Sequence, residues 1–398
     1  MKPQVAERLS DRITIGVLTS TYPPALVDRV VAESGRGEQR HRLLPARVVV
    51  YLVLAMALFS GQAYEEVARL LVEGLAWARR WRGSWRVPST PAIAKARARL
   101  GPAPLKALFQ VAVRPLATPA TQGAWYRGWR LVSLDGTTLD VPDSPANAAW
   151  FGRPATHRGE QTAFPQVRVV ALAECGTHAI IQAAIGAYTT GEMSLAPALF
   201  GALSPELLLL ADRGFVGADL WRAAQATGAA LVWRTRTNAV LPVLEALPDG
   251  SYLSRIVAAR DHRQRRDPIT VRVIEYTLGK DPGRPQRPAP YRLLTTILDP
   301  AQAPAAELAA LYHERWEFET TLAELKTHQR GPGVVLRSRS PAGVEQEVWA
   351  MLLVHHAIRR LMHQAALGAD LDPDRLSFVR SLRVVRRQVT SGQAALSP

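Results

Sequence analysis

The stretch Leu207-Leu-Leu-Leu-Ala-Asp212 does the most to decide the fold of this chain. It is a short, continuous apolar run that ends in a carboxylate, as expected of a strand buried on both faces of a sheet. Ligands of open α/β sheets bind at the carboxyl ends of such strands. Asp212 is therefore a candidate functional residue, although an aspartate at a strand end is more often an ordinary cap or turn residue.

The segments around this run alternate between strand and helix periodicity. Strands are predicted at residues 130–141, 165–174, 178–187 and 229–235, and helices at residues 194–203 and 214–227. Together with the central run, this order of three strands, a helix, a strand, a helix and a strand indicates an α/β fold. We expect a mixed sheet flanked by helices.

Residues 236–300 make up a segment longer than one further helix or strand requires. It contains the β-forming stretches 252–254, 269–276 and 291–297, and the loops at 260–266 and 279–290 are rich in arginine, proline and glycine. We interpret the segment as a β-rich insertion whose arginines contact phosphate. A basic loop by itself is more often simply solvated, so this role stays open.

The two ends of the chain have helical patterns. Near the amino terminus, a Ser/Thr-Pro start precedes a basic helix at 92–100 with Lys95, Arg97 and Arg99. This pattern fits a helix-turn-helix, and equally an all-helical packing domain with a solvated basic face. We therefore predict a helical DNA-binding domain at 1–124, a catalytic domain at 125–338, and a helical region at 339–398 that is a candidate for dimerisation.

Composition narrows the class of protein. Among 398 residues, 49 are basic and 34 acidic, which gives a formal net charge of +15 and indicates a polyanionic partner such as nucleic acid. A coding bias toward arginine is the competing explanation, but it does not account for the small number of acids. The single cysteine, Cys175, excludes a disulfide framework and cysteine-based zinc fingers, and the nine histidines show no metal-ligand spacing.

The longest apolar run, Val48 to Phe59, falls short of the ~18 residues that a membrane span requires. We interpret it as a buried helix. The expected setting is the cytoplasm, without membrane association, where the protein is nucleoid-associated when bound to DNA.

A second stretch carries the chemistry: Tyr312-His-Glu-Arg315-Trp-Glu-Phe-Glu319-Thr-Thr-Leu-Ala-Glu-Leu-Lys326. On a regular helix, Tyr312, Arg315, Glu319 and Lys326 fall within an arc of roughly 60° beside an apolar stripe. Such a polar seam suits a phosphodiester and a metal ion. Lys326 is one of only five lysines in the chain. The other acids of this stretch, at positions 314, 317 and 324, point away from the seam.

Asp135, inside the first predicted strand, joins Asp212 and Glu319 as a third candidate carboxylate. A charge facing the core of a sheet needs a partner or a metal. Three hard oxygen ligands favour Mg²⁺ or Mn²⁺, and such a cluster can hold two ions ~3.5–4 Å apart. Each acid also has an ordinary structural explanation when it is taken alone.

These motifs together resemble the DDE transposases of the insertion-sequence-four family. The resemblance rests on Asp-Gly-Thr at 135–137, Ala-Asp-Arg-Gly at 211–214 and the spacing Tyr-x2-Arg-x3-Glu-x6-Lys. Residues 15–71 also resemble the helical amino-terminal domain of that family. The resemblance covers most of the chain and is weakest in the last fifty residues.

The resemblance implies an RNase H-like catalytic fold interrupted by a β insertion, with Asp135, Asp212 and Glu319 as the metal-binding triad. It implies phosphate contacts for Tyr312, Arg315 and Lys326 at the transposon end, and with less support for Arg213. Family members typically nick double-stranded DNA, form a hairpin and join the excised end to a target as a synaptic dimer. Hairpin formation needs a flipped base on an aromatic ring, for which Trp233 is a weak candidate, since a strand tryptophan is usually core.

Three functions remain open at this point: an active transposase, a catalytically silent DNA-binding or regulatory protein derived from one, and a purely hydrolytic metal-dependent nuclease. The intact acids disfavour the silent protein, and the polar seam and the insertion disfavour the simple nuclease.

Overall fold

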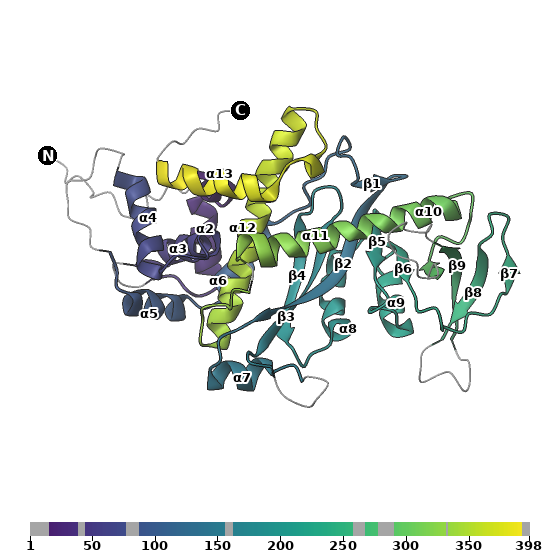
Figure 1. Cartoon of the computed structure of the whole chain (residues 1–398), viewed down its shortest axis with the longest axis horizontal. Helices are drawn as coiled ribbons and strands as arrows, with labels where there is room; N and C mark the ends of the chain where they lie inside the picture. The colour runs from purple at the N-terminus through teal and green to yellow at the C-terminus, as the bar shows by residue number, and fades with distance from the viewer. Residues whose placement is uncertain are drawn as a thin grey trace.

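A computed structural model of the chain describes residues 16–38, 44–76, 87–155, 162–257, 267–277, 290–331 and 333–391. One mixed sheet runs through this part of the chain, with helices on both of its faces and a helical bundle beside one end (Figure 1). None of the described helices combines the length and the hydropathy that crossing a bilayer requires.

The centre of the sheet has the strand order β4-β3-β2-β5-β6. These strands are β2 (Trp129–Asp140), β3 (Gln166–Glu174), β4 (Ile180–Ala187), β5 (Leu207–Ala211) and β6 (Ala230–Arg234). The first three pair antiparallel, while β5 pairs parallel with both β2 and β6. An antiparallel meander followed by two parallel strands is the order of an RNase H-like sheet, so the predicted fold class is confirmed. The short strand β1 (Trp125–Tyr126) pairs with β2.

Alternate residues of the central strands form two separate apolar cores on the two faces of the sheet. Leu209 and the apolar residues on the same face of the sheet pack against η2 (Ala196–Ala202) and α9 (Ala218–Gln225). The short helix α8 (Glu192–Leu195) directly precedes η2. Leu208 and Leu210 face the other way, toward α10 (Ala305–Leu311). All five residues of β5 are buried, as the apolar run predicted.

The predicted β insertion is present and extends the same sheet. Its strands are β7 (Glu245–Ala246), β8 (Tyr252–Ile256), β9 (Ile269–Thr277) and β10 (Pro290–Thr295), in the order β10-β9-β8-β7 beyond β6. Arg272 of β9 is fully buried and donates to Ser251 Oγ at 2.7 Å and to the Ala303 carbonyl at 2.7 Å, with an ion pair to Asp249. The arginine-rich loop at 260–266 and residues 279–289 lie outside the described residues.

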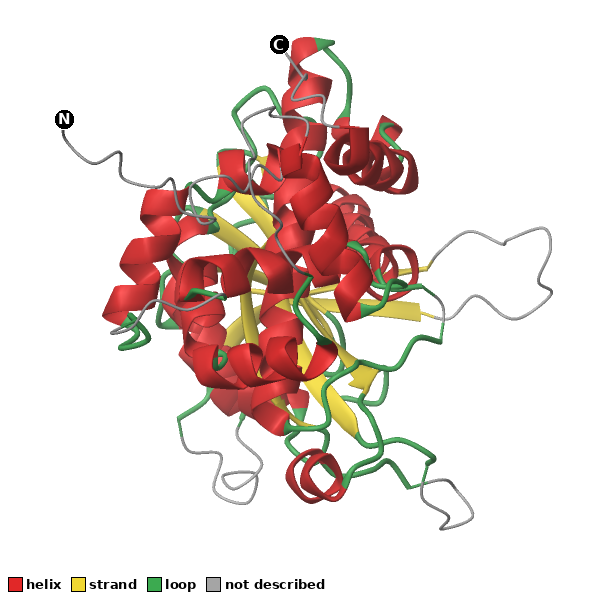
Figure 2. Cartoon of the chain, turned by 90° about the vertical axis from the view of Figure 1, so that its left-hand side faces the viewer, coloured by secondary structure: helices red, strands yellow, loops and turns green. Residues whose placement is uncertain are grey.

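The amino-terminal region is helical, as predicted. Its helices are α1 (Gly16–Thr21), α2 (Pro24–Glu33), α3 (Ala46–Leu58), α4 (Tyr64–Ala76), α5 (Thr90–Leu100) and α6 (Ala103–Ala112). Every residue of α3 except Arg47 is buried, which confirms that the longest apolar run is a buried helix. Helices α1, α3, α5 and α6 contact α12 (Pro341–Gly368), so both ends of the chain share one hydrophobic core. Viewed from this end of the molecule, the helices lie in front of the strands (Figure 2).

The remaining carboxy-terminal elements follow the predicted pattern. Helix α12 begins after Ser340, whose Oγ accepts from the backbone N–H of Gly343 at 3.4 Å, and it has a proline in its first turn. It is followed by the 3₁₀ turn η6 (Pro373–Arg375) and by α13 (Phe378–Ser391), which packs on α12 and α4. Helix α7 (Pro145–Phe151) lies between β2 and β3 in sequence.

The basic helix α5 is anchored by a buried polar network. Arg97 is only 6% exposed and donates to Gln346 Oε1 at 2.8 Å, to Tyr64 Oη at 2.8 Å and to Glu347 Oε1 at 3.2 Å. Arg97 therefore holds α5 against α12, and it does not belong to a solvated basic face. Lys95 on the same helix is exposed. DNA binding by this helix stays a prediction.

The stretch expected as one regular helix is divided into three parts. After α10 come the 3₁₀ turn η4 (Tyr312–Arg315), α11 (Trp316–Ala323) and the π-helical turn η5 (Glu324–Gln329). The predicted 60° arc was wrong because it assumed one constant period. In a 3₁₀ turn, residues three apart lie directly above one another. Tyr312 and Arg315 are consequently both buried, whereas Glu319 and Lys326 are exposed.

Candidate active site

Two of the three candidate carboxylates lie side by side on the sheet. Leu134 of β2 pairs with Ala211 of β5 across a parallel ladder, and Asp135 and Asp212 are the next residues on the two strands. Adjacent strands are about 5 Å apart, so the two carboxyl groups leave the backbone as close neighbours. The two aspartates are 77 residues apart in sequence, and the parallel pairing of β2 with β5 brings them together.

Glycines beside both aspartates fix how the carboxylates lie. The backbone N–H of Gly136 donates to Asp135 Oδ1 at 2.7 Å, and that of Gly214 donates to Asp212 Oδ1 at 2.7 Å. A Cβ at position 214 would lie 2.9 Å from Asp212 Oδ1, and one at position 136 would lie 2.5 Å from the side chain of Glu192. A side chain at position 214 would therefore crowd the Asp212 carboxylate itself, whereas one at position 136 would only displace the flexible end of Glu192.

Arg315 connects the sheet to the third carboxylate. Its Nη1 lies 3.4 Å from Asp135 Oδ2, and its Nη2 lies 3.2 Å from Glu319 Oε1. These bonds place the Asp135 and Glu319 carboxylates at most about 9 Å apart, because both nitrogens belong to one planar guanidinium. The structure thus gathers Asp135, Asp212 and Glu319 around one buried arginine, although the three are far apart in sequence.

The electrostatics of Asp135 reflect this crowding. Burial raises the pKa of its carboxyl from 3.8 to about 6, against the opposing effect of the Gly136 N–H bond. The neighbouring charge of Asp212 raises the pKa further, and Arg315 lowers it. The carboxylates therefore have more negative charge than one guanidinium balances. Clustered oxygen ligands with excess negative charge fit a hard divalent cation.

Tyr312 supports the same edge of the sheet from behind. Its side chain is 3% exposed, and its hydroxyl donates to the carbonyl of Ala211 at 3.2 Å, one residue before Asp212. Burial raises the pKa of the phenol, so Tyr312 is a neutral hydrogen-bond donor. The phosphate contact that the resemblance implies for Tyr312 stays a prediction, since in this structure its hydroxyl is directed at the protein backbone.

The other predicted cations are on the surface. Lys326 in η5 and Arg213, directly after Asp212, are both exposed. The side chain of Glu319 is 47% exposed, so this carboxylate forms the solvent-facing edge of the cluster. This distribution puts buried groups against the sheet and accessible charges on its outer side.

The competing acids in the same segments have other partners. Asp140 Oδ1 accepts from Gln166 Nε2 at 2.8 Å, and Asp143 pairs with Arg153. The three glutamates at 314, 317 and 324 line a cavity that does not include the Asp135 cluster. Trp233 is fully buried and packs edge-on against Trp221 at 5.1 Å, so it is a core residue and not a stacking platform for a base.

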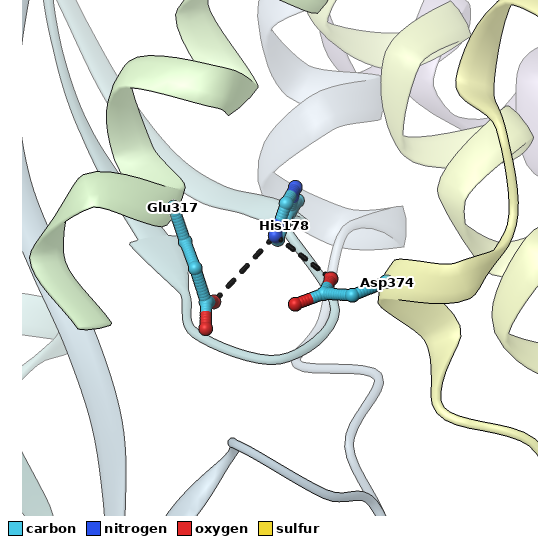
Figure 3. Close-up of side chains that lie close together, drawn as sticks. All are labelled: His178, Glu317 and Asp374. Carbon is cyan, nitrogen blue, oxygen red and sulfur yellow. Dashed lines mark ion pairs between the residues drawn. The ribbon is translucent and has the colours of Figure 1, made fainter.

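The structure also shows a cluster that the sequence did not reveal. His178, Glu317 and Asp374 bring one nitrogen and two carboxylate oxygens within 4.8 Å of one another (Figure 3). The histidines show no metal-ligand spacing in the sequence, and spacing cannot reveal side chains that converge from three distant segments. No sequence signal identifies this cluster, since its members are 139 and 57 residues apart.

Two family models match the chain. One is described as the insertion element 4 transposase N-terminal and matches residues 12–110. The other is described as the transposase DDE domain and matches residues 127–356, more than half of the chain. This second match contains all three candidate carboxylates.

Similar proteins agree with these matches. The transposase InsG for insertion sequence element IS4 of Escherichia coli is 29% identical over 379 residues, which are 94% of this chain and 82% of that protein. The putative transposase InsZ of Escherichia coli is 25% identical over 201 residues, 50% of this chain and 63% of that protein. Among solved structures, a piggyBac transposase synaptic complex with hairpin DNA covers 97% of this chain and 83% of that chain, at 11% identity and a TM-score of 0.49.

Proposed function

The chain belongs to the DDE transposases of the insertion-sequence-four family, and on that premise we propose that Asp135, Asp212 and Glu319 are its catalytic carboxylates. The family activity is metal-dependent cleavage and strand transfer of DNA. The observation that carries the assignment is the adjacent register of Asp135 and Asp212, together with the Arg315 bridge to Glu319.

The proposed cofactor is Mg²⁺ or Mn²⁺, as two ions held by these three carboxylates. When bound, such ions supply a nucleophile from water or a 3′-hydroxyl and stabilise the leaving oxygen. Carboxylate oxygens without a histidine or cysteine suit these hard cations. The excess negative charge that raises the pKa of Asp135 to about 6 supports the same proposal.

The protein's own residues have separate tasks in this proposal. Tyr312 fixes the end of β5 through the Ala211 carbonyl and so orients Asp212. Arg315 holds Asp135 and Glu319 in place and adds positive charge next to the scissile phosphate. Lys326 and Arg213, both exposed, contact the DNA backbone on the outer side.

DNA is the partner, and the net charge of +15 agrees with this. We propose that the protein recognises the terminal inverted repeats of its own element and cleaves them as a homodimer, with the exposed face of α13 in the carboxy-terminal helical region as the candidate dimer contact. The proposed location is the cytoplasm, where the protein is nucleoid-associated when it is bound to DNA.

Neither alternative function is favoured. A silent regulatory descendant has no need for three intact carboxylates, two of them paired with Arg315 and the third on the neighbouring strand, and a simple nuclease has no need for the β insertion. A transposase requires two DNA ends and uses a 3′-hydroxyl as a nucleophile. A hydrolytic enzyme requires neither, because its nucleophile is always water.

The experiment that tests the proposal is incubation of the protein with DNA carrying its own element ends and Mg²⁺, followed by a denaturing gel. We expect joined or hairpinned strands. We expect them to form only when two DNA ends and two protomers are present. Nicked strands without any joined product would favour the purely hydrolytic nuclease over the transposase. Efficient cleavage of a single end by a monomer would refute the synaptic dimer.

A further inference from the structure

A cavity borders η4, α11 and η5, on the face of these elements that does not include Arg315 and Glu319. Its volume is about 580 Å³, and it is lined by residues of η4, α11 and η5, of the turn between β3 and β4, and of the segment that leads into α13. The cavity has room for several water molecules. The His178, Glu317 and Asp374 side chains converge at it from three separate segments (Figure 3).

The distances within this cluster are those of atoms around one small ion. His178 Nε2 lies 3.0 Å from Asp374 Oδ1 and 3.6 Å from Glu317 Oε2. Two ligand atoms on a tetrahedral ion ~2.1 Å away lie about 3.4 Å apart. The cluster can therefore receive an ion after only small side-chain movements.

The imidazole edge of His178 points into the cluster without a hydrogen bond. His178 is 5% exposed, and its Nε2 atom has no hydrogen-bond partner among the described residues, although a carboxylate lies nearby. Buried polar atoms are nearly always bonded, and the nearest polar atom to Nε2 is Asp374 Oδ1 at 3.0 Å, a contact without hydrogen-bond geometry, so Nε2 is available to a bound group. The main chain also holds His178 in the left-handed region, at a φ of 55°, which aims the ring from the turn.

The charges around the cavity do not balance the two carboxylates. Among the described residues that line it, Arg359 is the only arginine or lysine, while Glu314 and Glu324 add further acids and His313 and His328 add imidazole rings. Arg359 is already engaged with Glu324 through both its Nε and its Nη2 atoms. Glu317 and Asp374 therefore lie on either side of His178 with no arginine or lysine between them. Burial and the hydrogen bond with Glu314 raise the pKa of Glu317 to about 9, so metal binding at neutral pH would release a proton from this carboxyl group.

We propose that His178 Nε2, Glu317 and Asp374 bind one transition-metal dication, with Zn²⁺ as the best-suited ion. One imidazole nitrogen with two carboxylate oxygens suits Zn²⁺ better than Mg²⁺, and three protein ligands leave a position for water from the cavity. This site shares no residue with the three carboxylates of the proposed active site, so the proposal does not depend on that assignment.

Binding at Nε2 requires the ring proton to move to the other nitrogen. Nδ1 now accepts from Arg359 Nη2 at 2.5 Å, which leaves the proton of the neutral ring on Nε2. With an ion bound, the proton would sit on Nδ1, so Arg359 Nη2 would have to move away from this atom and Glu324 Oε1, now 4.0 Å away, would become the acceptor. A carboxylate behind a metal-bound histidine is a common arrangement.

The site would join three parts of the fold. His178 comes from the turn between β3 and β4, Glu317 from α11 and Asp374 from η6. Because α11 carries Glu319 on a different face, an ion behind it would fix the helix from the side opposite the DNA. The ion would also bind the segment before α13 to the sheet.

The test uses the full chain with the substitutions Asp135→Asn, Asp212→Asn and Glu319→Gln, which remove the first set of carboxylates. Calorimetric titration with Zn²⁺ should show one ion per chain, and thermal unfolding should show a rise in Tm that Mg²⁺ at the same concentration does not produce. Adding Asp374→Asn should weaken Zn²⁺ binding at least about tenfold. The matched control, Asp370→Asn, changes an exposed carboxylate four residues earlier and should leave binding unchanged.

Asp374 is the preferred position because its side chain is 39% exposed and an isosteric amide leaves the packing intact. His178→Asn is the second variant, since asparagine tolerates the left-handed conformation. Absence of Zn²⁺ binding in the triple variant would overturn the proposal. Equal Zn²⁺ affinity with and without Asp374→Asn would overturn it as well.

Discussion

Arg315 places its Nη1 atom 3.4 Å from Oδ2 of Asp135, a residue 180 positions earlier in the chain. The arginine is only 7% exposed and extends from η4 onto the sheet. A buried guanidinium is stable only where its charge is matched, and here the match comes from the proposed catalytic carboxylates. The same contact that stabilises Arg315 therefore holds two of the three acids in position before DNA arrives.

Neutral substitutions of the triad should separate catalysis from binding. Asp135→Asn, Asp212→Asn or Glu319→Gln should each reduce Mg²⁺-dependent cleavage of the element ends by at least about a thousandfold, the scale on which loss of one electrostatic group acts. Binding of the ends in a gel-shift assay should persist. The control is Asp140→Asn in the same strand, whose carboxylate is bonded to Gln166. A variant that still cleaves at the full rate would remove its residue from the triad.

The exposed and the buried cations of the seam should respond differently to substitution. Lys326→Ala should lower the slope of log affinity against log salt by about one, since each phosphate contact releases roughly one counterion. Arg222→Ala, which changes a half-exposed cation of α9 that is paired with Asp219 and Asp267, serves as the control. Equal slopes for Lys326→Ala and the unchanged protein would exclude a phosphate contact by this lysine.

Arg315→Ala should act mainly through the carboxylates. Without the guanidinium, the pKa of Asp135 should rise further above about 6, because burial and Asp212 then act on it unopposed by a cation. We expect cleavage to fall at neutral pH and to recover in part at higher pH. The pH–rate profile of Arg315→Ala, compared with that of Lys326→Ala, measures this shift; two profiles of the same shape would argue against it.

Tyr312→Phe tests the hydrogen bond behind Asp212. Loss of the hydroxyl leaves the Ala211 carbonyl without this donor and should lower the free energy of unfolding by about 1 kcal/mol. Cleavage should fall while the salt dependence of DNA binding stays the same. Tyr126→Phe, which removes an exposed bond to Glu307, is the control and should change stability little. A reduced salt slope in Tyr312→Phe would instead favour a direct phosphate contact.

The buried hydrogen bonds and ion pair of Arg97 predict that its substitution strongly lowers the free energy of unfolding. This residue lies on α5, the helix for which a solvated basic face was one of the expectations. Arg97→Met should destabilise the fold by about 3–5 kcal/mol, because it leaves Glu347 buried without its partner. Adding Glu347→Gln should restore part of the loss. Lys95→Ala on the exposed side of α5 should be nearly neutral in chemical denaturation. Similar denaturation midpoints for Arg97→Met and Lys95→Ala would show that the network contributes little.

Local patterns were enough to predict the sheet and its acids. The apolar run at 207–211 and the alternating strands before it determine the order of the sheet, because short connections leave few other pairings. The position of Asp135 beside Asp212 follows from that order. The polar seam was predicted less well, since a change of helical period inside 312–329 is decided by burial of Tyr312 and Arg315 and not by local propensity.

Tertiary contacts decided the features that the sequence did not reveal. The sequence around Arg97 is as basic as that of a DNA-binding helix. Arg97 is nevertheless buried, because α12 docks against α5. The cluster of His178, Glu317 and Asp374 likewise depends on how η6 packs against the turn between β3 and β4. Such long-range contacts have no period and no spacing in the sequence.

The histidines of α12 predict how stability depends on pH. His356 is buried, and burial lowers its pKa from 6.5 to about 4, with the neighbouring His355 and Arg360 acting in the same direction and the bond to the Arg114 carbonyl acting against them. The unfolded chain therefore takes up a proton on this ring at a higher pH than the folded chain. Stability from His356 is present above about pH 6.5 and is lost as the pH falls toward 4.

His356→Gln keeps an N–H donor near the Arg114 carbonyl and removes the titration. The unfolding free energy of the unchanged protein, minus that of the variant, should fall by about 3 kcal/mol between neutral pH and about pH 4. Burial also lowers the pKa of His355 and of His363, and burial raises that of Asp135, but these groups are present in both proteins and cancel in the difference. Denaturant titrations of both proteins across this range provide the measurement. A difference that does not change with pH would mean that His356 takes up its proton at the same pH in the folded and the unfolded chain, and burial would then not control this ring.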